Sequence, residues 1–242
     1  MEQGDLKKLF SLPVIVAALG YFVDIYDLLL FSIVRVTSLK SLNVITEQDL
    51  LDKGIYLSNA QMAGLLVGGI LWGIMGDKRG RLSVLFGSIL LYSLANIANG
   101  FVTTVDQYAF LRFIAGIGLA GELGAGITLV SEVLPTRLRG YGTTIVASVG
   151  LFGAVAANLV AHTVKDNWQI AYFIGGGLGL ILLMTRISVL ESGIFLKVKE
   201  ETDDRGNFVK LFTSRDKLSR FLSCIFIGLP IWFVIGILIT FS

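Results

Sequence analysis

The sequence predicts an all-α integral membrane protein, and three observations support this fold class. Hydrophobic residues make up 54% of the chain and charged residues only 16%, and mean hydropathy is +0.77. Charged residues are about a quarter of an ordinary soluble domain. The apolar residues also fall in long blocks, several of them longer than the ~20 residues that cross a bilayer as a helix. The 28 glycines against 3 prolines fit close packing between membrane helices.

Apolar segments along the chain are the predicted spans. In order they are Ser11–Val36, Leu57–Gly76, Leu82–Val102, Tyr108–Val130, Tyr141–His162, Trp168–Leu190 and Phe221–Phe241. Backbone groups in lipid must be hydrogen-bonded internally, so each segment is expected to be a helix. The run Leu28–Phe31 lacks the alternation of a membrane β-barrel. The first segment has two carboxylates and no small-residue cleavage site, which indicates an uncleaved span.

The spacing of these segments predicts the domain organisation. Residues 1–190 form an amino-terminal six-helix transmembrane bundle, 191–220 a cytoplasmic inter-bundle linker, and 221–242 a seventh transmembrane helix that begins a second bundle. The linker is mixed in charge. A solvated linker and a helix along the membrane surface, with Phe208, Leu211 and Phe212 facing lipid, are both open. The other long connection is expected on the outer side, at Thr37–Tyr56.

Basic residues predict the orientation. One side carries those of the 191–220 segment together with Lys7, Lys8, Lys78, Arg79, Arg81, Arg137 and Arg139. The opposite side carries only Lys40, Lys53 and Lys165. Because basic residues remain in the cytoplasm, the amino terminus is expected inside, in a multi-pass protein of the plasma (bacterial inner) membrane.

The connection between the second and third spans is the most specific local pattern, and it runs from Gly73 to Arg81. Two helices reverse direction here within a few polar residues. We expect Gly80 to adopt a backbone angle that other residues resist. Gly73 and Gly76 are expected to let the second span pack closely on a neighbour, and Asp77 to accept hydrogen bonds from the start of the third.

This pattern resembles the loop signature of the major facilitator superfamily: glycine, three residues, aspartate, a base, any residue, glycine, arginine. The stretch from Arg112 through Gly116, Gly118 and Gly121 to the Glu132–Gly140 turn resembles that family's fourth helix and the following loop, especially in sugar porters and metabolite–proton symporters. We expect the three glycines to pack against neighbouring helices. The resemblance implies a cytoplasmic gating role for Gly73, Asp77, Lys78, Gly80, Arg81, Glu132 and Arg139.

The resemblance also implies a fold of twelve helices in two halves, each made of two inverted three-helix repeats, with the site between the halves near the membrane midplane. The chain would hold the amino-terminal half plus one helix, truncated relative to that fold. Its missing partner would be the carboxy-terminal half. Residues 1–242 alone are then not expected to perform alternating access.

Ionisable residues inside the spans are the candidate site. Burying each costs about 2.5–3.5 kcal/mol on insertion scales, so they normally face an interior cavity. Asp24 and Asp27 share one face of the first span, and Arg112 lies at a depth where it can reach Asp27. Three interpretations stay open: an ion pair that only holds helices together, a set of substrate ligands, and a proton carrier.

We assign proton coupling to Asp27, Asp24 and Arg112, because an acid on the first helix and an arginine on the fourth resemble the sugar–proton symporters. Asp27 is favoured for the proton and Asp24 for substrate. Candidate substrate-binding residues are Asp24, Glu122, Tyr21 and Tyr26. The polar residues Gln61, Asn96, Asn99 and Asn158 are expected to form hydrogen bonds between helices, with contacts to a sugar-like ligand as the alternative.

Other chemistry is excluded by composition. One histidine and one cysteine do not make a metal cluster, no phosphate-binding loop is present, and no basic cluster suits nucleic acid. We expect no cofactor and no enzyme activity.

The predicted function is a secondary active transporter that moves a small polar metabolite, a sugar or an organic acid, by alternating access as a proton symporter. The alternatives are a seven-span receptor or sensor and an inactive fragment or assembly subunit of a membrane complex.

Overall fold

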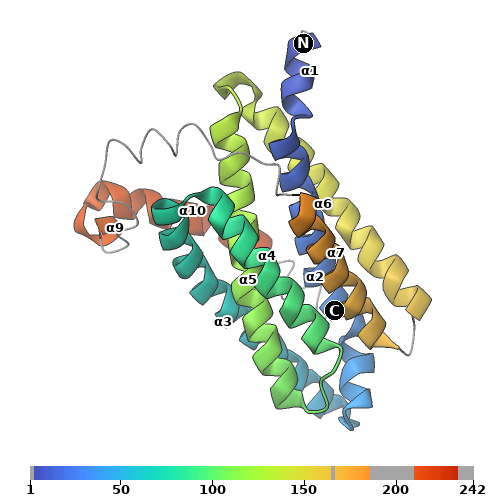
Figure 1. Ribbon diagram of the computed structural model, residues 1–242. Coiled ribbons are helices and arrows are strands. Elements are labelled where there is room, and N and C mark those ends of the chain that lie inside the picture. Colours follow the sequence, from blue (N-terminus) through green and yellow to red (C-terminus); the bar gives the residue numbers. More distant parts are fainter. Residues whose placement is uncertain (1–2, 165–166, 186–209, 234–242) are drawn as a thin grey trace. The chain divides into compact units, whose positions relative to one another are not determined.

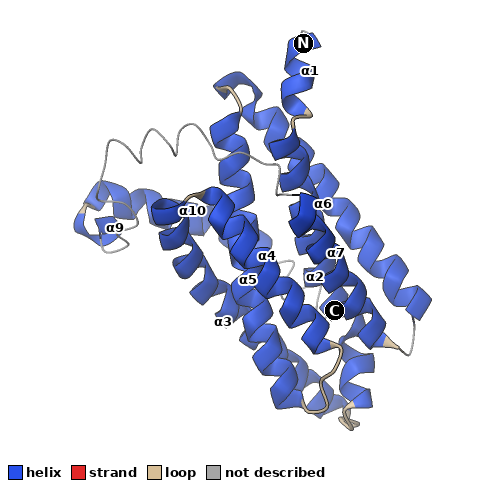
Figure 2. Cartoon of the chain, in the orientation of Figure 1, coloured by secondary structure: helices blue, strands red, loops and turns tan. Residues whose placement is uncertain are grey.

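The computed structural model describes residues 3–164, 167–185 and 210–233, and every regular element within them is a helix (Figure 2). The helices are α1 (Gln3–Leu9), α2 (Leu12–Ser41), α3 (Glu47–Arg79), α4 (Arg81–Asn99), α5 (Val105–Val133), α6 (Thr136–Val164), α7 (Trp168–Thr185), α9 (Lys210–Thr213) and α10 (Arg215–Phe233). The chain divides into two compact units, Met1–Asp203 and Asp204–Ser242. The division falls inside the segment expected to be a linker.

Six of the described helices, α2 to α7, are long and apolar enough to cross a membrane, and they overlap the first six predicted segments. Residues 186–190, the end of the sixth predicted segment, lie outside the described residues. In the second unit, α10 contains Pro230 and covers the first part of the seventh predicted segment. The remainder of that segment, residues 234–242, lies outside the described residues. Most of the expected linker lies outside them as well, apart from α9 and the first turns of α10.

The expected long outer connection at Thr37–Tyr56 is wrong. Helix α2 continues to Ser41 and α3 begins at Glu47, which leaves only residues 42–46 between them. The side chain of Thr46 caps α3 by accepting a hydrogen bond from the backbone N–H of Asp49 at 3.1 Å. Glu47 and Asp49 place negative charge in the first turn, where the helix dipole favours it. Hydropathy locates the apolar part of a span, whereas caps locate its ends.

The six helices follow one another as two sets of three, α2–α4 and α5–α7 (Figure 1), and the most extensive contacts between the sets correspond. The most extensive contacts join α3 to α5 and α2 to α6. These two contacts are equivalent, because α2 and α5 are the first helices of their sets and α3 and α6 are the second. The detail repeats as well. A methyl group on Gly64 of α3 would collide with the carbonyl oxygen of Phe113, and one on Gly153 of α6 with that of Phe22. This is the packing expected of two inverted three-helix repeats.

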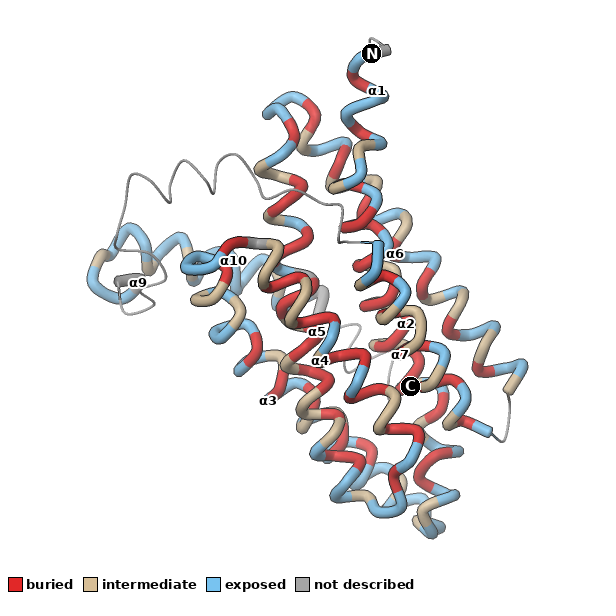
Figure 3. The backbone as a smooth tube through the Cα atoms, in the orientation of Figure 1, coloured by how far each residue is buried: buried red, intermediate tan, exposed pale blue. Residues whose placement is uncertain are grey.

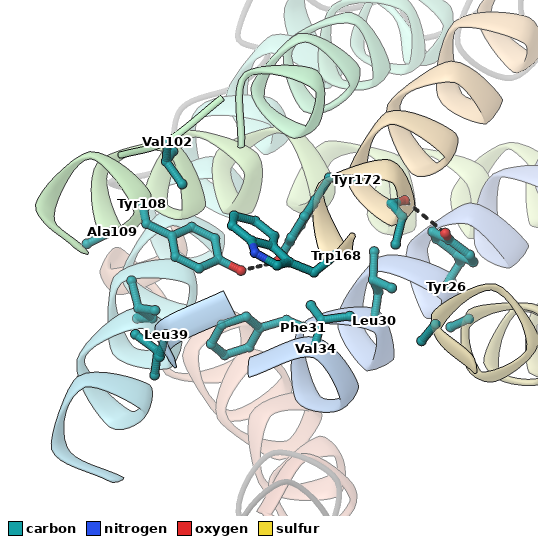
Figure 4. Packing of buried hydrophobic residues seen from close by; sticks show 14 residues of the cluster. Tyr26, Leu30, Phe31, Val34, Leu39, Val102, Tyr108, Ala109, Trp168 and Tyr172 are labelled. Atoms are coloured by element: carbon teal, nitrogen blue, oxygen red, sulfur yellow. Dashed lines mark hydrogen bonds between the residues drawn. The ribbon is translucent and has the colours of Figure 1, made fainter. Parts of the chain in front are cut away.

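Helices α2 and α5 lie at the centre of the first unit. Within their most apolar stretches 61% and 59% of the residues are buried, against 22% for α3 and 28% for α6 (Figure 3). The candidate charged residues are carried by the two most buried helices. The largest apolar cluster surrounds Tyr26, Tyr108, Trp168 and Tyr172 and joins α2, α5 and α7 (Figure 4).

Candidate functional site

The central feature is an ion pair between Asp27 of α2 and Arg112 of α5. Nη1 of Arg112 lies 3.6 Å from Oδ2 of Asp27, and both side chains are buried almost completely. The depth argument from the sequence predicted that this pair was possible, and the structure brings the two residues together. Neither group faces the outer surface of the bundle.

Gln61 of α3 bridges the two charges. Its Nε2 donates to Oδ2 of Asp27 at 3.4 Å, and its Oε1 accepts a hydrogen bond from Nη2 of Arg112. The amide therefore turns its positive end to the carboxylate and its negative end to the guanidinium. The sequence predicted that Gln61 bonds between helices, but its place at the charged pair was missed. Gln61 could have been recognised from the sequence as a site residue, because it is an amide within an apolar span and the span that carries Arg112 is rich in glycine.

Glycine at position 116 permits this arrangement. Gly116 follows Arg112 by one helical turn, and a methyl group there would collide with the backbone carbonyl oxygen of Gln61 and lie 3.1 Å from the backbone nitrogen of Leu65. Helices α3 and α5 thus touch backbone to backbone. The expected packing role of Gly116, Gly118 and Gly121 is confirmed. A methyl group at Gly118 would lie 2.6 Å from the nitrogen of Tyr92, and one at Gly121 would lie 2.6 Å from Cβ of Ser88.

Aromatic side chains cover the ion pair. The Phe31 ring centroid lies 4.3 Å from Cζ of Arg112, within the range of a cation–π contact. Phe31 meets Tyr108 edge to face, Tyr108 stacks on Trp168 with ring centroids 5.7 Å apart, and the hydroxyls of Tyr108 and Tyr172 are 2.6 Å apart (Figure 4). Such an apolar wall strengthens the electrostatic interactions that it encloses.

Several polar atoms at this centre have no hydrogen-bond partner within the described part of the chain. They are Oδ1 of Asp27, Nε and Nη1 of Arg112, the Asn96 amide and the Tyr92 hydroxyl. Asn96 lies beside Asp27, and Tyr92 lies near both aspartates. Buried charge is costly unless it is fully paired or neutralised. The arrangement can therefore accept a proton on the carboxylate or an anion at the guanidinium. Tyr92 was not among the candidates from the sequence.

The remaining predicted site residues occupy different surroundings. Asp24 and Glu122 are buried. The Tyr26 hydroxyl donates to the carbonyl oxygen of Ala171 on α7 at 2.9 Å (Figure 4), and the half-buried Tyr21 ring packs on Gly150 of α6. In this conformation the two tyrosines thus join helices. Among the described residues no group of three or more histidine, cysteine, aspartate or glutamate side chains is placed to hold a metal.

The turn between α3 and α4 has the expected glycine geometry. Gly80 has φ 99° and ψ 162°, a conformation that residues with a Cβ avoid. Asp77 lies in the last turn of α3, and the residue capping α4 is Gly80; the expected hydrogen bonds of Asp77 to the start of α4 stay a prediction. Lys78 is exposed; the side chain of Arg81 is outside the described atoms. At the other turn, Arg139 donates from Nε to the carbonyl oxygen of Leu134 at 3.2 Å.

The expected close packing of Gly73 is wrong. A methyl group there would meet nothing within 4 Å. Gly73 instead borders a cavity of about 220 Å³ between α3, α4 and α5. The cavity is lined by Gly69, Trp72, Gly73, Gly76, Val84, Ala120, Gly121, Gly124, Ala125 and Thr128. Two glycines nearer the start of α3, Gly64 and Gly68, make the close contact with α5 instead.

Comparison with known proteins gives consistent matches. The model of the Major Facilitator Superfamily matches residues 11–242. The chain is 26% identical over 216 residues to the benzoate transport protein of Acinetobacter baylyi, covering 86% of the chain and 45% of the relative. It is 31% identical over 214 residues to a putative metabolite transport protein of Haemophilus influenzae, covering 85% and 48%. The 3-(3-hydroxy-phenyl)propionate transporter of Escherichia coli is 31% identical, covering 60% and 36%.

A solved structure shares the fold. The proton:xylose symporter XylE bound to 6-bromo-6-deoxy-D-glucose superposes with a TM-score of 0.73 at 18% sequence identity, covering 81% of this chain and 47% of that one. The chain thus spans less than half the length of each of these proteins.

Proposed function

Since the chain belongs to the major facilitator superfamily, we propose that it serves in a secondary transporter that moves a small organic acid together with a proton. The observation that carries the proposal is the buried Asp27–Gln61–Arg112 group, in which one acid and one base are enclosed by apolar side chains. Ionisable groups at such depth in a membrane protein are rare and usually face the interior of the bundle, where they mark substrate or proton pathways.

Asp27 is the proposed proton carrier. Its Oδ1 has no hydrogen-bond partner in the described part of the chain, and its only nearby cation there is held at 3.6 Å rather than in a short contact. A buried carboxylate paired this loosely can be neutralised by a proton from whichever side of the membrane the site faces. Asp24, buried on the same helix, is the second candidate.

Arg112 favours an organic acid over a sugar. A guanidinium binds carboxylates through two parallel N–H groups, and Nε and Nη1 of Arg112 have no hydrogen-bond partner among the described residues. The relatives support this class, because several are named for benzoate, niacin, 4-hydroxybenzoate or 3-(3-hydroxy-phenyl)propionate. Glu122, Tyr21 and Tyr26 remain candidates for contacts to the rest of such a molecule.

Proton symport suits an anionic substrate energetically. Moving one negative charge into a cell whose interior is negative costs about 2.3 kcal/mol per 100 mV. A proton carried in the same step cancels that charge.

We propose further that the amino terminus is cytoplasmic in an inner membrane, supported by the basic residues near the α3–α4 and α5–α6 turns. There Asp77, Lys78, Arg81, Glu132 and Arg139 act as gating residues.

Alternating access in this fold needs a second six-helix half, so the test uses the product of the complete gene in proteoliposomes. Labelled benzoate, 4-hydroxybenzoate, nicotinate, phosphate and xylose are supplied with an inward proton gradient. We expect at least one aromatic carboxylate to accumulate, and a protonophore to abolish that accumulation. Accumulation of xylose or phosphate alone would overturn the substrate class, and accumulation unaffected by the protonophore would overturn proton coupling.

A further inference from the structure

The position of Gln61 between the two charges assigns it a task of its own. We propose that Gln61 is a positioning residue that holds Arg112 off Asp27, so that neutralising Asp27 frees Arg112 for the carboxylate of the substrate. This inference rests on the proposed function. It adds a third residue from a third helix to a mechanism otherwise built on Asp27 and Arg112.

The distances support a spacer. Charge-assisted contacts between guanidinium and carboxylate groups are ordinarily about 2.7–2.9 Å and often bidentate. Here Nη1 of Arg112 is 3.6 Å from Oδ2 of Asp27, and Nε and Nη1 of Arg112 donate no hydrogen bond to the carboxylate. The Gln61 amide contacts both partners, and it donates to the same Oδ2 atom that faces Arg112. The amide thus takes the place of a short, direct hydrogen bond between the two charged groups.

The backbone fixes the spacer in place. The carbonyl oxygen of Gln61 lies where a methyl group on Gly116 would be, and Gly64 of the same helix packs against the carbonyl of Phe113. Helix α3 therefore cannot slide along α5 without a backbone collision. The Gln61 side chain cannot withdraw to lipid either, since the residue is only 2% exposed. Its orientation is set as well, because a flipped amide would point N–H groups at the guanidinium and oxygen at the carboxylate.

The consequence concerns the order of events. A proton from water adds to a carboxylate oxygen of Asp27 and removes the negative charge that attracts Arg112. Arg112 keeps its hydrogen bond to Oε1 of Gln61 through Nη2. Its Nε and Nη1, which have no hydrogen-bond partner in the described part of the chain, then bind an incoming carboxylate. Without the spacer, the guanidinium closes onto the unprotonated carboxylate and is withheld from substrate.

The test measures exchange of labelled benzoate by the complete gene product in proteoliposomes at equal pH on both sides. Gln61→Met keeps the side-chain length but removes both hydrogen bonds. We expect its KM to rise roughly tenfold, because the substrate must then displace the Asp27 carboxylate from Arg112 at a cost of about one charged hydrogen bond, with the maximal rate within about twofold. In the double variant Asp27→Asn/Gln61→Met the KM should return to that of Asp27→Asn, since Arg112 has no anion to close onto.

Two further variants sharpen the result. Gln61→Glu gives Arg112 a permanent anionic partner, so its raised KM should persist when Asp27→Asn is added. Asn99→Leu removes another wholly buried amide, one with no hydrogen-bond partner among the described residues, and should leave KM unchanged. A Gln61→Met defect that survives Asp27→Asn, or an equal defect in Asn99→Leu, refutes the spacer. If the wild type exchanges no aromatic carboxylate, the proposed function fails and this inference fails with it.

Discussion

At the scale of single residues, the site depends on three side chains from three helices that satisfy one another incompletely. Asp27 and Arg112 share one 3.6 Å contact, and Gln61 supplies a hydrogen bond to each. Helical depth alone predicted that Asp27 and Arg112 could meet, because a fixed rise per residue makes depth countable. The depth of a residue along its helix could not predict the role of Gln61. Its reach depends on how closely α3 crosses α5, a property of the packed bundle.

Removing one charge of the pair should destabilise the protein more than removing both. Arg112→Gln leaves the Asp27 carboxylate buried and uncompensated, which typically costs about 3–5 kcal/mol. Asp27→Asn/Arg112→Gln leaves only neutral amides and should recover much of that loss. The measurement is thermal unfolding of the purified proteins in detergent at neutral pH. A double variant no more stable than Arg112→Gln would show that the two charges do not interact.

At the scale of the elements, glycines decide which helices touch. Of the seven spans that the sequence predicted, six are among the described helices. The close contact of the second span was predicted at Gly73 and Gly76, whereas Gly73 makes none and Gly64 and Gly68 pack against α5. A glycine-rich helix shows that close approach is possible. Which of its faces is used depends on the neighbouring helix. The helix ends were missed for a related reason, since the outer turns of α2 and α3 are polar and lie beyond the apolar windows.

Adjacent glycines of α3 offer a matched test of this packing. A methyl group at Gly68 would lie 2.7 Å from Cα of Ile117, whereas one at Gly69 would meet nothing within 4 Å. Gly68→Ala should therefore lower the melting temperature. Gly69→Ala should leave it unchanged or raise it slightly, because alanine favours helix by about 0.5–1 kcal/mol over glycine. Equal effects of the two substitutions in the same thermal assay would argue against the α3–α5 contact.

At the scale of the whole molecule, two inverted three-helix sets enclose the candidate site, where their first members, α2 and α5, meet α3. The sequence predicted this architecture through two motifs at the α3–α4 and α5–α6 turns, and the match to the family over residues 11–242 confirms the family assignment. The substrate class did not follow from the sequence, because a buried arginine and buried acids suit hydroxyls and carboxylates alike. The names of the relatives were needed to favour an organic acid.

The orientation is testable with single cysteines. After the native cysteines of the complete gene product, Cys224 among them, are replaced by serine, Ile45→Cys places a thiol in the exposed α2–α3 turn and Thr136→Cys one at the start of α6. We expect a membrane-impermeant maleimide to label position 45 in intact cells and position 136 only after permeabilisation. The reverse pattern would contradict a cytoplasmic amino terminus.

The central claim is that Asp27 carries the proton that accompanies the substrate, and a pH electrode tests it most directly. Benzoate, or whichever acid the uptake assay identifies, is added to lightly buffered, de-energised cells that express the complete gene product. The account predicts a transient alkalinisation of the medium with the wild type. It predicts none with Asp27→Asn, although that variant still exchanges labelled substrate. Alkalinisation of undiminished size in Asp27→Asn would contradict the account.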